Sequence, residues 1–294
     1  MPSRVALATY ARAPTLAPDD QLLPPALDAI GIRGEPVVWS SDTVRWPAFD
    51  AVVIRSCWDY HLRFTEFLSW VDHLDRSGIV VLNSPSLVRW NADKRYLLDL
   101  ARRGVATIPT MVLPRGRAAA VESLATAEGW THFVLKPTIS ASGYETHALR
   151  PPLDADARDA IARVLGAGDA LIQPFADEVA SIGEYSFSFI DGRFSHATLK
   201  RATAGEFRVQ TEHGGSVAPV DAAPELIEQA AHVLRALPEV PLYARVDGVE
   251  RGGAFLLMEL ELIEPNLFLG RGPGAAERLA AAIARRLEQR GTRD

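Results

Sequence analysis

The chain has 294 residues, of which 48% are hydrophobic and 23% are charged, and its formal net charge is −6. This composition is typical of an ordinary soluble enzyme, and the acidic balance excludes a sequence-wide basic surface for nucleic acid or anionic membranes. The single cysteine excludes an intrachain disulfide and fits a reducing cytoplasm, and no apolar run is long enough to span a bilayer.

Short apolar runs alternate with amphipathic stretches over residues 4–82, in the order strand, helix, strand, strand, helix, strand. The second helix, near 64–76, carries one apolar stripe, formed by Phe67, Leu68, Val71 and Leu74. We expect Thr65 to cap this helix and Gly78 to end it. The pattern predicts an N-terminal lobe over 1–90, with a mostly parallel sheet and helices on its faces.

The middle of the chain, residues 91–170, is predicted to form a second lobe. A helix from about 94 to 103 is followed by strand candidates at 110–113 and 133–137. The polar, glycine-containing segment 138–146 comes directly after the second of these strands. A polar loop is therefore expected at the end of a buried strand.

The last part of the chain, residues 171–294, changes to long antiparallel strands. Asp191-Gly192 is a strong signal for one hairpin turn, and Gly252-Gly253 marks a second hairpin. Helices near 223–236 and 274–289 are expected to cover one face of this third lobe.

Lysine is rare in this chain, because Lys94, Lys136 and Lys200 are the only lysines among 31 basic residues. An ammonium is a compact point charge that can meet a single phosphate oxygen, which the planar guanidinium fork does not reproduce. Lys136 follows an apolar run and is expected on or at the end of a buried strand, where an unpaired lysine is unusual. Each lysine also has a simpler interpretation. Lys136 could extend to water from the edge of the strand. Lys94 could be an ordinary solvated helix residue, and Lys200 a solvated strand end.

Acidic and apolar side chains alternate near the last predicted strand. Residues two apart on a strand point to one face, so Glu259 and Glu261 should project together. The apolar residues between and beside them should pack on the opposite face: Met258, Leu260 and Leu262. The alternative is a strand whose acidic face is simply solvated.

A hairpin centred near Gly253 would place Asp247 opposite Glu259 and add a third carboxylate to this face. Neighbouring carboxylates repel one another unless a cation lies between them, and magnesium takes such hard oxygen ligands. Arg245 points to the same face by the same alternation. It can stabilise negative charge that develops on a transferring phosphoryl group, or it can simply pair with Asp247.

Taken together, these features resemble the ATP-grasp superfamily, particularly the branch of glutathione synthetase, the RimK-type ligases and D-alanine–D-alanine ligase, over most of the chain. The resemblance implies an α/β fold with a doubly wound N-terminal sheet and an antiparallel C-terminal lobe. Lys94 and Lys136 match the two lysines that contact ATP phosphates in the family. The flexible loop after the second lysine corresponds to 138–146, with Ser140 and Ser142 as implied ATP-binding residues.

The segment 171–178 resembles the adenine hinge of the family. Backbone groups of Gln173, Pro174 and Phe175 would meet the base, and an acidic side chain would meet the ribose. The candidates for that acid are Asp177 and Glu178. The strands that begin near Glu184 and end at Lys200 resemble the floor of the nucleotide cleft.

The most specific match is Arg245-x-Asp247 followed twelve residues after the aspartate by Glu259-x-Glu261. It resembles the Arg-x-Asp and Glu-x-Asn magnesium signature, with Glu261 where asparagine is usual. The implied metal ligands are Asp247, Glu259 and Glu261, and Asn266 is a less favoured source of an amide ligand. The implied cofactors are ATP and Mg²⁺, with Mn²⁺ as an alternative metal.

The segment 205–215 is similar to a glutathione synthetase loop with Arg-x-Asn and paired glycines, although Gln210 replaces the asparagine. Arg208 is a candidate catalytic residue beside Arg245 because it can clamp a phosphate or carboxylate. Gly214 and Gly215 would let the backbone approach a substrate closely. The alternative is a plain surface turn.

Arg55 follows a predicted strand, and ligands of open α/β sheets collect beyond such strand ends. We expect Arg55 to hold a substrate carboxylate and Trp58 and Tyr60 to shape the pocket, with aromatic packing between lobes as the alternative. Cys57 is expected to be a small buried residue. The implied chemistry needs no nucleophilic side chain, so His196, His213 and Ser142 are expected at most to position other groups.

The resemblance implies an ADP-forming ligase that activates a small carboxylate as an acyl phosphate and joins it to an amine. The cyclising ligase of D-cycloserine biosynthesis is similar in size and lobe order, so an intramolecular reaction on an amino-acid derivative is an alternative. A nucleotide-binding regulatory protein is a further alternative, but it would not need the complete acidic set. We expect a small amino-acid-like substrate, with no nucleic acid or membrane partner, and the oligomeric state stays open, a homo-oligomer included.

Overall fold

The N-terminal lobe is a four-stranded parallel sheet in a computed structural model that describes residues 2–203, 206–209 and 214–291. The strand order is β2-β1-β3-β4, and the strands are β1 Ser3–Thr9, β2 Ile32–Val38, β3 Ala51–Ser56 and β4 Val81–Leu82. Alternate residues of β1 pack on opposite faces of the sheet: Val5 and Leu7 meet α1 (Leu23–Asp28), and Ala6 and Ala8 meet α2 (Phe64–Arg76). The predicted doubly wound sheet is confirmed.

Helix α2 begins differently from the prediction. The 3₁₀ turn Tyr60–Arg63 runs directly into the helix, so there is no free N-terminus for Thr65 to cap, and that prediction is wrong. Thr65 lies in the first turn, and its carbonyl accepts a hydrogen bond from the Ser69 hydroxyl. Gly78 follows the helix with a φ of +70°, a conformation that suits glycine at a helix end. Helix α3 (Pro85–Asn91), capped by Ser84, was not anticipated.

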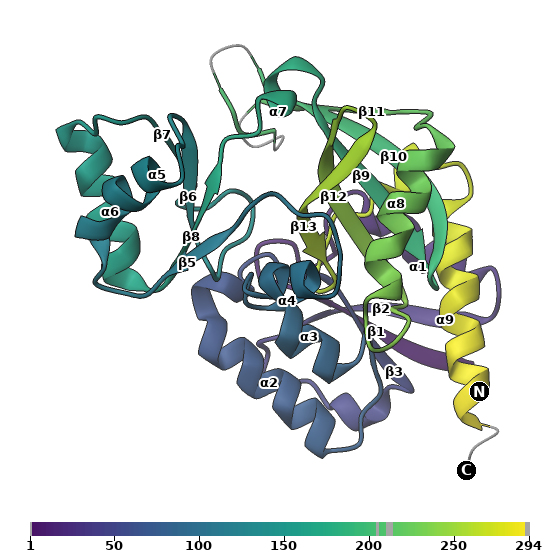
Figure 1. Cartoon of the computed structure of the whole chain (residues 1–294). Coiled ribbons are helices and arrows are strands. Elements are labelled where there is room, and N and C mark those ends of the chain that lie inside the picture. Colours follow the sequence, from purple (N-terminus) through teal and green to yellow (C-terminus); the bar gives the residue numbers. More distant parts are fainter. Residues whose placement is uncertain (1, 204–205, 210–213, 292–294) are drawn as a thin grey trace.

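The central sheet is antiparallel in the order β5-β8-β6-β7, and Figure 1 shows it at one side of the molecule with its helices. Its strands are β5 Met111–Leu113, β6 Phe133–Pro137, β7 His147–Leu149 and β8 Ala170–Pro174. Helices α5 (Val121–Ala127) and α6 (Ala155–Ala167) share its hydrophobic core. Because β8 continues past residue 170, the central sheet extends beyond the expected boundary; the division of the chain into three domains stays a prediction.

The C-terminal sheet has five antiparallel strands in the order β11-β10-β9-β12-β13. Its strands are β9 Glu184–Ile190, β10 Arg193–Arg201, β11 Ser216–Pro219, β12 Tyr243–Arg251 and β13 Ala254–Glu261. Both predicted hairpins are therefore confirmed. A short helix, α7 (Asp177–Ser181), connects the central sheet to β9.

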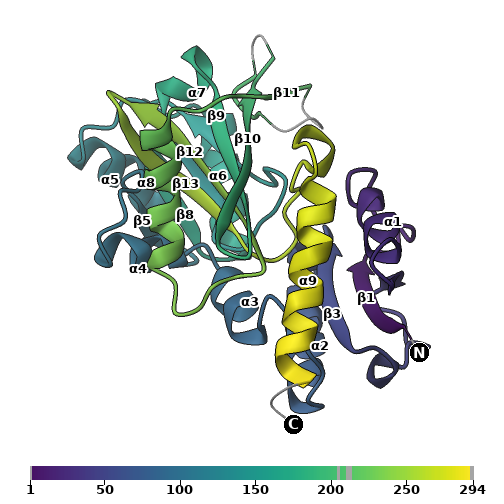
Figure 2. The same cartoon turned by 90° about the vertical axis from the view of Figure 1, so that its right-hand side faces the viewer.

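The helices that cover this sheet differ in part from the prediction. Helices α4 (Tyr96–Arg102) and α8 (Pro224–Arg235) share its apolar core. Helix α9 (Ala275–Gly291) instead packs chiefly against α1, because Leu279 and Ile283 lie in the core that contains Leu7 of the parallel sheet. Figure 2 shows α9 between the N-terminal lobe and the C-terminal sheet. It therefore joins the first and last parts of the chain.

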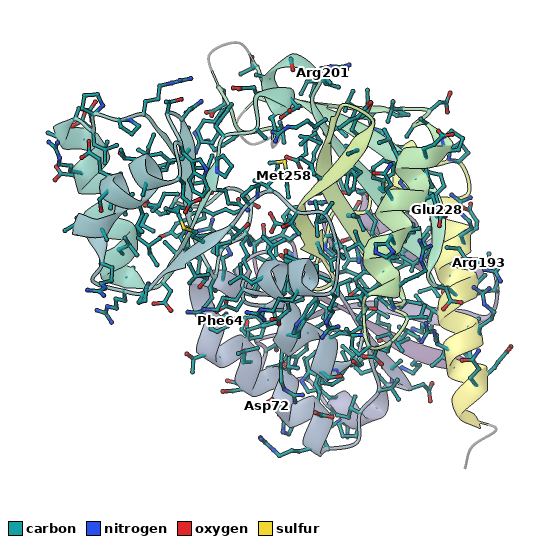
Figure 3. The ribbon with its side chains drawn as sticks, in the orientation of Figure 1. Phe64, Asp72, Arg193, Arg201, Glu228 and Met258 are labelled. Atoms are coloured by element: carbon teal, nitrogen blue, oxygen red, sulfur yellow. The ribbon has the colours of Figure 1, made fainter. Side chains whose placement is uncertain are left out.

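A β-bulge corrects the predicted alternation of β13. Asp247 pairs with Glu259 as expected, but Gly248 pairs with Leu257, so Met258 is an extra residue in the strand. Leu260 packs in the core on the far face, whereas Met258 faces the central sheet (Figure 3). In the part of the chain that the structure describes, no helix combines the length and apolar character needed to cross a membrane.

Candidate active site

A cavity of about 240 Å³ is lined by residues from all three lobes. Most of its charged lining comes from the ends and edges of strands. We call these residues the charged cluster: the cations Lys94, Lys136, Lys200 and Arg245, and the acids Glu184, Asp247, Glu259, Glu261 and Glu264. The predicted lysines and carboxylates are thus brought together, although Lys94 and Glu261 lie 167 residues apart in the sequence (261 − 94).

Asp247 lies at the centre of the charged cluster and is almost completely buried. Its carboxylate accepts hydrogen bonds from the Ser186 hydroxyl at 2.6 Å and from Arg245 Nη2 at 2.8 Å, and it pairs with Lys200 Nζ at 3.0 Å. Although burial opposes it, the charges of Arg245 and Lys200 lower the pKa of Asp247. Lys200 also pairs with Glu184 at 2.5 Å, so it forms ion pairs with both Asp247 and Glu184 on the same sheet.

The two glutamates of β13 are paired with different cations. Lys94 Nζ lies 2.9 Å from Glu259 Oε1, and Glu261 pairs with Arg245. Burial raises the pKa of Glu261 to about 7, and repulsion by Glu259 adds to this rise while Arg245 opposes it. Lys94 lowers the pKa of Glu259 despite the burial of that carboxyl group. The carboxylates of this face are therefore stabilised by nearby positive charge, and each glutamate of β13 already pairs with one cation.

Lys136 differs from the other cations of the charged cluster. Its side chain is buried, with 9% of the residue exposed, and its ammonium makes no hydrogen bond or ion pair with any residue that the structure describes. Burial lowers the pKa of Lys136; the charge of Glu259 opposes this lowering, and the charge of Lys94 adds to it. A buried, unpaired ammonium beside a cavity is a suitable partner for an anionic ligand.

The predicted metal ligands have suitable chemistry but are occupied by cations. Among the described residues, no group of three or more acidic, histidine or cysteine side chains is arranged to hold a metal ion. The side chains of Glu259 and Glu261 are 28% and 25% exposed, so their hard oxygen donors can meet a metal if Lys94 and Arg245 move. Asp247 would have to give up one of its own contacts. The Asn266 amide oxygen accepts the Phe268 N–H, which does not favour it as a ligand.

The predicted adenine hinge lines one end of the cavity. Gln173 donates to the Thr110 hydroxyl at 2.8 Å, and Pro174 and Phe175 continue the wall. The Phe175 ring stacks on His132 with centroids 3.8 Å apart. An apolar cluster lies close by, made of Ile108, Ala176, Val179, Val209 and Val249.

The two acids proposed for the ribose lie outside this wall. Asp177 is exposed at the start of α7. Glu178 pairs with Arg251 Nε at 2.5 Å, which also lowers the pKa of Glu178. Neither residue lines the cavity, although their neighbours Ala176 and Val179 do, so the two acidic side chains lie on the side of α7 away from it.

The loop after β6 and the loop before β11 meet the cavity to different extents. Ser140 and Ser142 line it, and the Ser140 carbonyl accepts a hydrogen bond from Lys94 Nζ at 2.5 Å. Arg208 also lines it, but its guanidinium pairs with Glu206 at 2.8 Å. Gly214 and Gly215 are not among the lining residues, which does not support close approach of their backbone to a substrate in this conformation. The predicted Gln210 and His213 lie outside the described residues.

Arg55 does not line the cavity, which does not favour its predicted role in binding substrate. The side chain is completely buried, because Nη2 pairs with Asp20 Oδ1 at 2.9 Å and donates to the Pro265 carbonyl at 2.7 Å. Its guanidinium carbon also lies 4.7 Å from the centre of the Tyr243 ring. Arg55 therefore joins the N-terminal lobe to the segment after β13, whereas Trp58 and Tyr60 line the cavity as expected.

Two further side chains lie as predicted, and two residues near the cavity were missed. Cys57 is a buried free thiol, and His196 is a buried positioning group that donates to the Leu267 carbonyl at 2.9 Å. Sequence reasoning missed Asn91. Its amide nitrogen donates to the Leu260 carbonyl, and its amide oxygen accepts the Leu262 N–H, so it fixes the end of β13. Sequence reasoning also gave no role to Glu264, a buried acid in the cavity wall. Its position directly before Pro265, at the end of the acidic strand, could have suggested that it faces the site.

The fold and the charged cluster define a ligase of the ATP-grasp class. Two solved structures share this fold across nearly the whole chain. D-alanine–D-alanine ligase from Bacillus anthracis complexed with ATP has a TM-score of 0.70 at 15% identity, covering 98% of both chains. An ATP-grasp RimK domain protein from Sphaerobacter thermophilus DSM 20745 has a TM-score of 0.70 at 19% identity, covering 95% of this chain and 98% of its own.

A particular family follows from closer relatives. Residues 5–83 match the family described as the N-terminal domain of D-cycloserine synthetase DcsG. The cycloserine biosynthesis protein DcsG of Streptomyces lavendulae is 36% identical over an alignment of 288 residues that covers 92% of this chain and 95% of that protein. The crystal structure of D-cycloserine synthetase DcsG has a TM-score of 0.89 at 33% identity, covering 97% of this chain and all of that chain. The chain belongs to the DcsG family and is an ATP-dependent carbon–nitrogen ligase.

Proposed function

We propose that this protein closes the ring of cycloserine or of a close analogue by forming an intramolecular amide bond. The family relationship supports this choice between the intramolecular and intermolecular reactions. The cycloserine ring contains one carbon–nitrogen amide bond, and its nitrogen also carries the ring oxygen. Opening that bond with water gives an amino acid with an aminooxy group on its β-carbon, so O-amino-D-serine is the expected substrate.

The reaction would take place in two steps. A carboxylate oxygen of the substrate attacks the γ-phosphorus of ATP, and the bond from that phosphorus to the β–γ bridging oxygen breaks to release ADP. The aminooxy nitrogen then attacks the acyl carbon, phosphate leaves with the carbon–oxygen bond electrons, and the nitrogen loses a proton. An aminooxy nitrogen is a weak base and is neutral at pH 7, so this step needs no strong general base.

The protein would contribute mainly position and charge to these steps. Lys94 and Lys136 would hold the phosphates, and Arg245 would stabilise the negative charge of the tetrahedral intermediate. Glu259 and Glu261 would hold Mg²⁺, with Asp247 as the third candidate, and the bound metal would neutralise phosphate charge. Gln173 to Phe175 would border the adenine.

The observation in the structure that carries the phosphoryl-transfer part of this proposal is the environment of Lys136. It is a buried ammonium that forms no ion pair or hydrogen bond with any described residue, although it lies within the electrostatic influence of Glu259 in the same cavity wall. A transferring phosphate would supply the missing negative charge. The same cavity extends to Trp58 and Tyr60, which leaves room for a small substrate beside the nucleotide.

The substrate requirement tests the proposal. The protein is incubated with ATP, Mg²⁺ and O-amino-D-serine, with and without a second amino acid such as D-alanine. We expect one ADP for each product molecule, a product mass lower than the substrate by one water, and no need for D-alanine. A strict requirement for two amino acids would support intermolecular ligation instead, and no ADP release across a panel of amino-acid derivatives would contradict the proposal.

A further inference from the structure

The irregular segment that follows β13 is held by an unusual series of side chains. Each carbonyl of residues 263–267 accepts a hydrogen bond from a side chain elsewhere in the chain. The donors, in order along the segment, are the Tyr243 hydroxyl, Trp58 Nε1, Arg55 Nη2, Arg245 Nη1, and both Ser188 Oγ and His196 Nε2. These donors come from both the N-terminal lobe and the C-terminal sheet, so the segment is fixed between them. A backbone fixed in this way can present a side chain to a ligand with little loss of conformational entropy.

Glu264 is the acidic side chain that this segment presents to the cavity. The residue is 8% exposed and lines the cavity wall together with Trp58 and Tyr60. Trp58 donates to the Glu264 carbonyl at 3.2 Å, which places the aromatic residue directly beside it. The carboxylate is thus buried at the end of the cavity formed with the N-terminal lobe.

Glu264 differs from the other acids of the charged cluster because it forms no ion pair, although the charges of Lys94 and Arg245 act on it from further away. Glu184 and Asp247 pair with Lys200, Glu259 pairs with Lys94, and Glu261 pairs with Arg245. Within the ranges 2–203, 206–209 and 214–291, no lysine, arginine or histidine forms an ion pair with Glu264. Burial disfavours the ionised form of a carboxyl group that has no ion pair, and a cation brought by a ligand to this position would favour that form.

We propose that Glu264 binds the α-ammonium group of the amino-acid substrate and thereby selects amino acids over simple carboxylic acids. This inference rests on the proposed function, because it names the group that recognises the amino-acid end of that substrate. Trp58 and Tyr60 add aromatic surface beside the ammonium, which favours a cation further. The substrate carboxylate would then point toward the phosphate site, with its ammonium held at the fixed segment 263–267.

The variant Glu264→Gln tests this role with little change in side-chain shape. Because glutamine has nearly the size of glutamate and is neutral, as a buried carboxyl group in its protonated form is, we expect the variant to fold. Its KM for O-amino-D-serine should rise about 10- to 100-fold, as expected when a hydrogen-bonded ion pair is lost, while the KM for ATP changes less than about twofold. Glu228→Gln is the matched control, since Glu228 lies on α8 with its side chain 71% exposed and should leave both values unchanged (Figure 3).

A substrate without the α-amine separates recognition from general damage. 3-(Aminooxy)propanoic acid lacks only that group, so the wild type should use it poorly and Glu264→Gln should use it equally poorly. An equal loss with both substrates would overturn the proposal, because the residue would then act on something other than the ammonium. A rise in the Mg²⁺ requirement with an unchanged substrate KM would also overturn it, since Glu264 would then serve the metal.

The inference can fail separately from the proposed function. If the wild type releases no ADP with any aminooxy acid, the proposed function fails, and binding of D-serine beside a non-hydrolysable ATP analogue then tests Glu264 by calorimetry. Binding to the wild type that is lost in Glu264→Gln would support the ammonium site. Equal binding to both proteins, or no binding to either, would overturn it.

Discussion

Replacing Lys136 with methionine should weaken nucleotide binding and stabilise the free protein at the same time. The substitution keeps most of the side-chain volume but removes an ammonium that is buried and forms no ion pair or hydrogen bond with any described residue; the longer-range attraction of Glu259 only partly offsets its burial. Removing the desolvated charge should raise the free energy of unfolding by about 1–2 kcal/mol. Each kcal/mol corresponds to roughly 2–4 °C in Tm for a protein of this size. The KM for ATP should rise about 10- to 100-fold, because a charge-assisted contact to phosphate is lost.

The stability gain expected for Lys136→Met should depend on pH, because the pKa of Lys136 is lowered in the folded protein. Burial lowers the pKa of Lys136 below its ordinary value of 10.5, so the unfolded chain binds more protons between these two values. Wild-type stability should therefore rise with pH in that window, and the advantage of the methionine variant should shrink as pH approaches 10.5. Scanning calorimetry at pH 7 and pH 10, without and with ATP, measures both effects. A variant less stable than the wild type at pH 7, or an unchanged KM for ATP, would refute the reasoning.

The same substitution at Lys94 is the matched comparison and should have the opposite effect on stability. Lys94 pairs with Glu259 and donates to the Ser140 carbonyl, so Lys94→Met leaves a carboxylate without its cation. We expect a loss of about 2–3 kcal/mol, below the usual range for a fully buried pair because the Glu259 side chain is 28% exposed. Unfolding in urea should show the two lysine variants on opposite sides of the wild type.

Three further substitutions test other parts of the structure. Asp20→Asn should lower the free energy of unfolding in urea by about 3–5 kcal/mol, because it leaves Arg55 buried without its carboxylate. Glu178→Ala should change stability by less than about 1 kcal/mol and leave the KM for ATP unchanged, since its contact with Arg251 is exposed; a higher KM would restore the ribose role. Burial raises the pKa of Glu261 to about 7, above its ordinary value of 4.5, so the free protein should lose stability as pH rises from about 5 to 7. Tm measured against pH should show this slope flattened in Glu261→Gln.

The sheets and the charged face were predictable because they depend on local patterns. Turn glycines fixed the centre of the last hairpin, and alternation along the strands then placed Asp247 opposite Glu259. The apolar run before Lys136 likewise indicated a buried strand, and the structure ends that strand at Pro137. These predictions needed no knowledge of distant parts of the chain.

The predictions that the structure does not support depended on contacts between distant segments. Arg55 follows a strand as a substrate-binding residue would, but its partners, Asp20 and the Pro265 carbonyl, are supplied by other elements. Alternation placed Met258 in the core, and the bulge that turns it toward the cavity has no signal in the spacing of apolar residues. The amphipathic pattern of α9 showed that one face is buried, but it could not show that α1 covers that face.

The central claim is that ATP activates a carboxylate of the substrate as an acyl phosphate. O-amino-D-serine labelled with ¹⁸O in both carboxylate oxygens tests this directly, with the released phosphate analysed by mass spectrometry. The account predicts that ADP forms and that each phosphate carries one ¹⁸O atom, because the attacking carboxylate oxygen leaves with phosphorus. Phosphate without the label, or the formation of AMP and pyrophosphate, would contradict it.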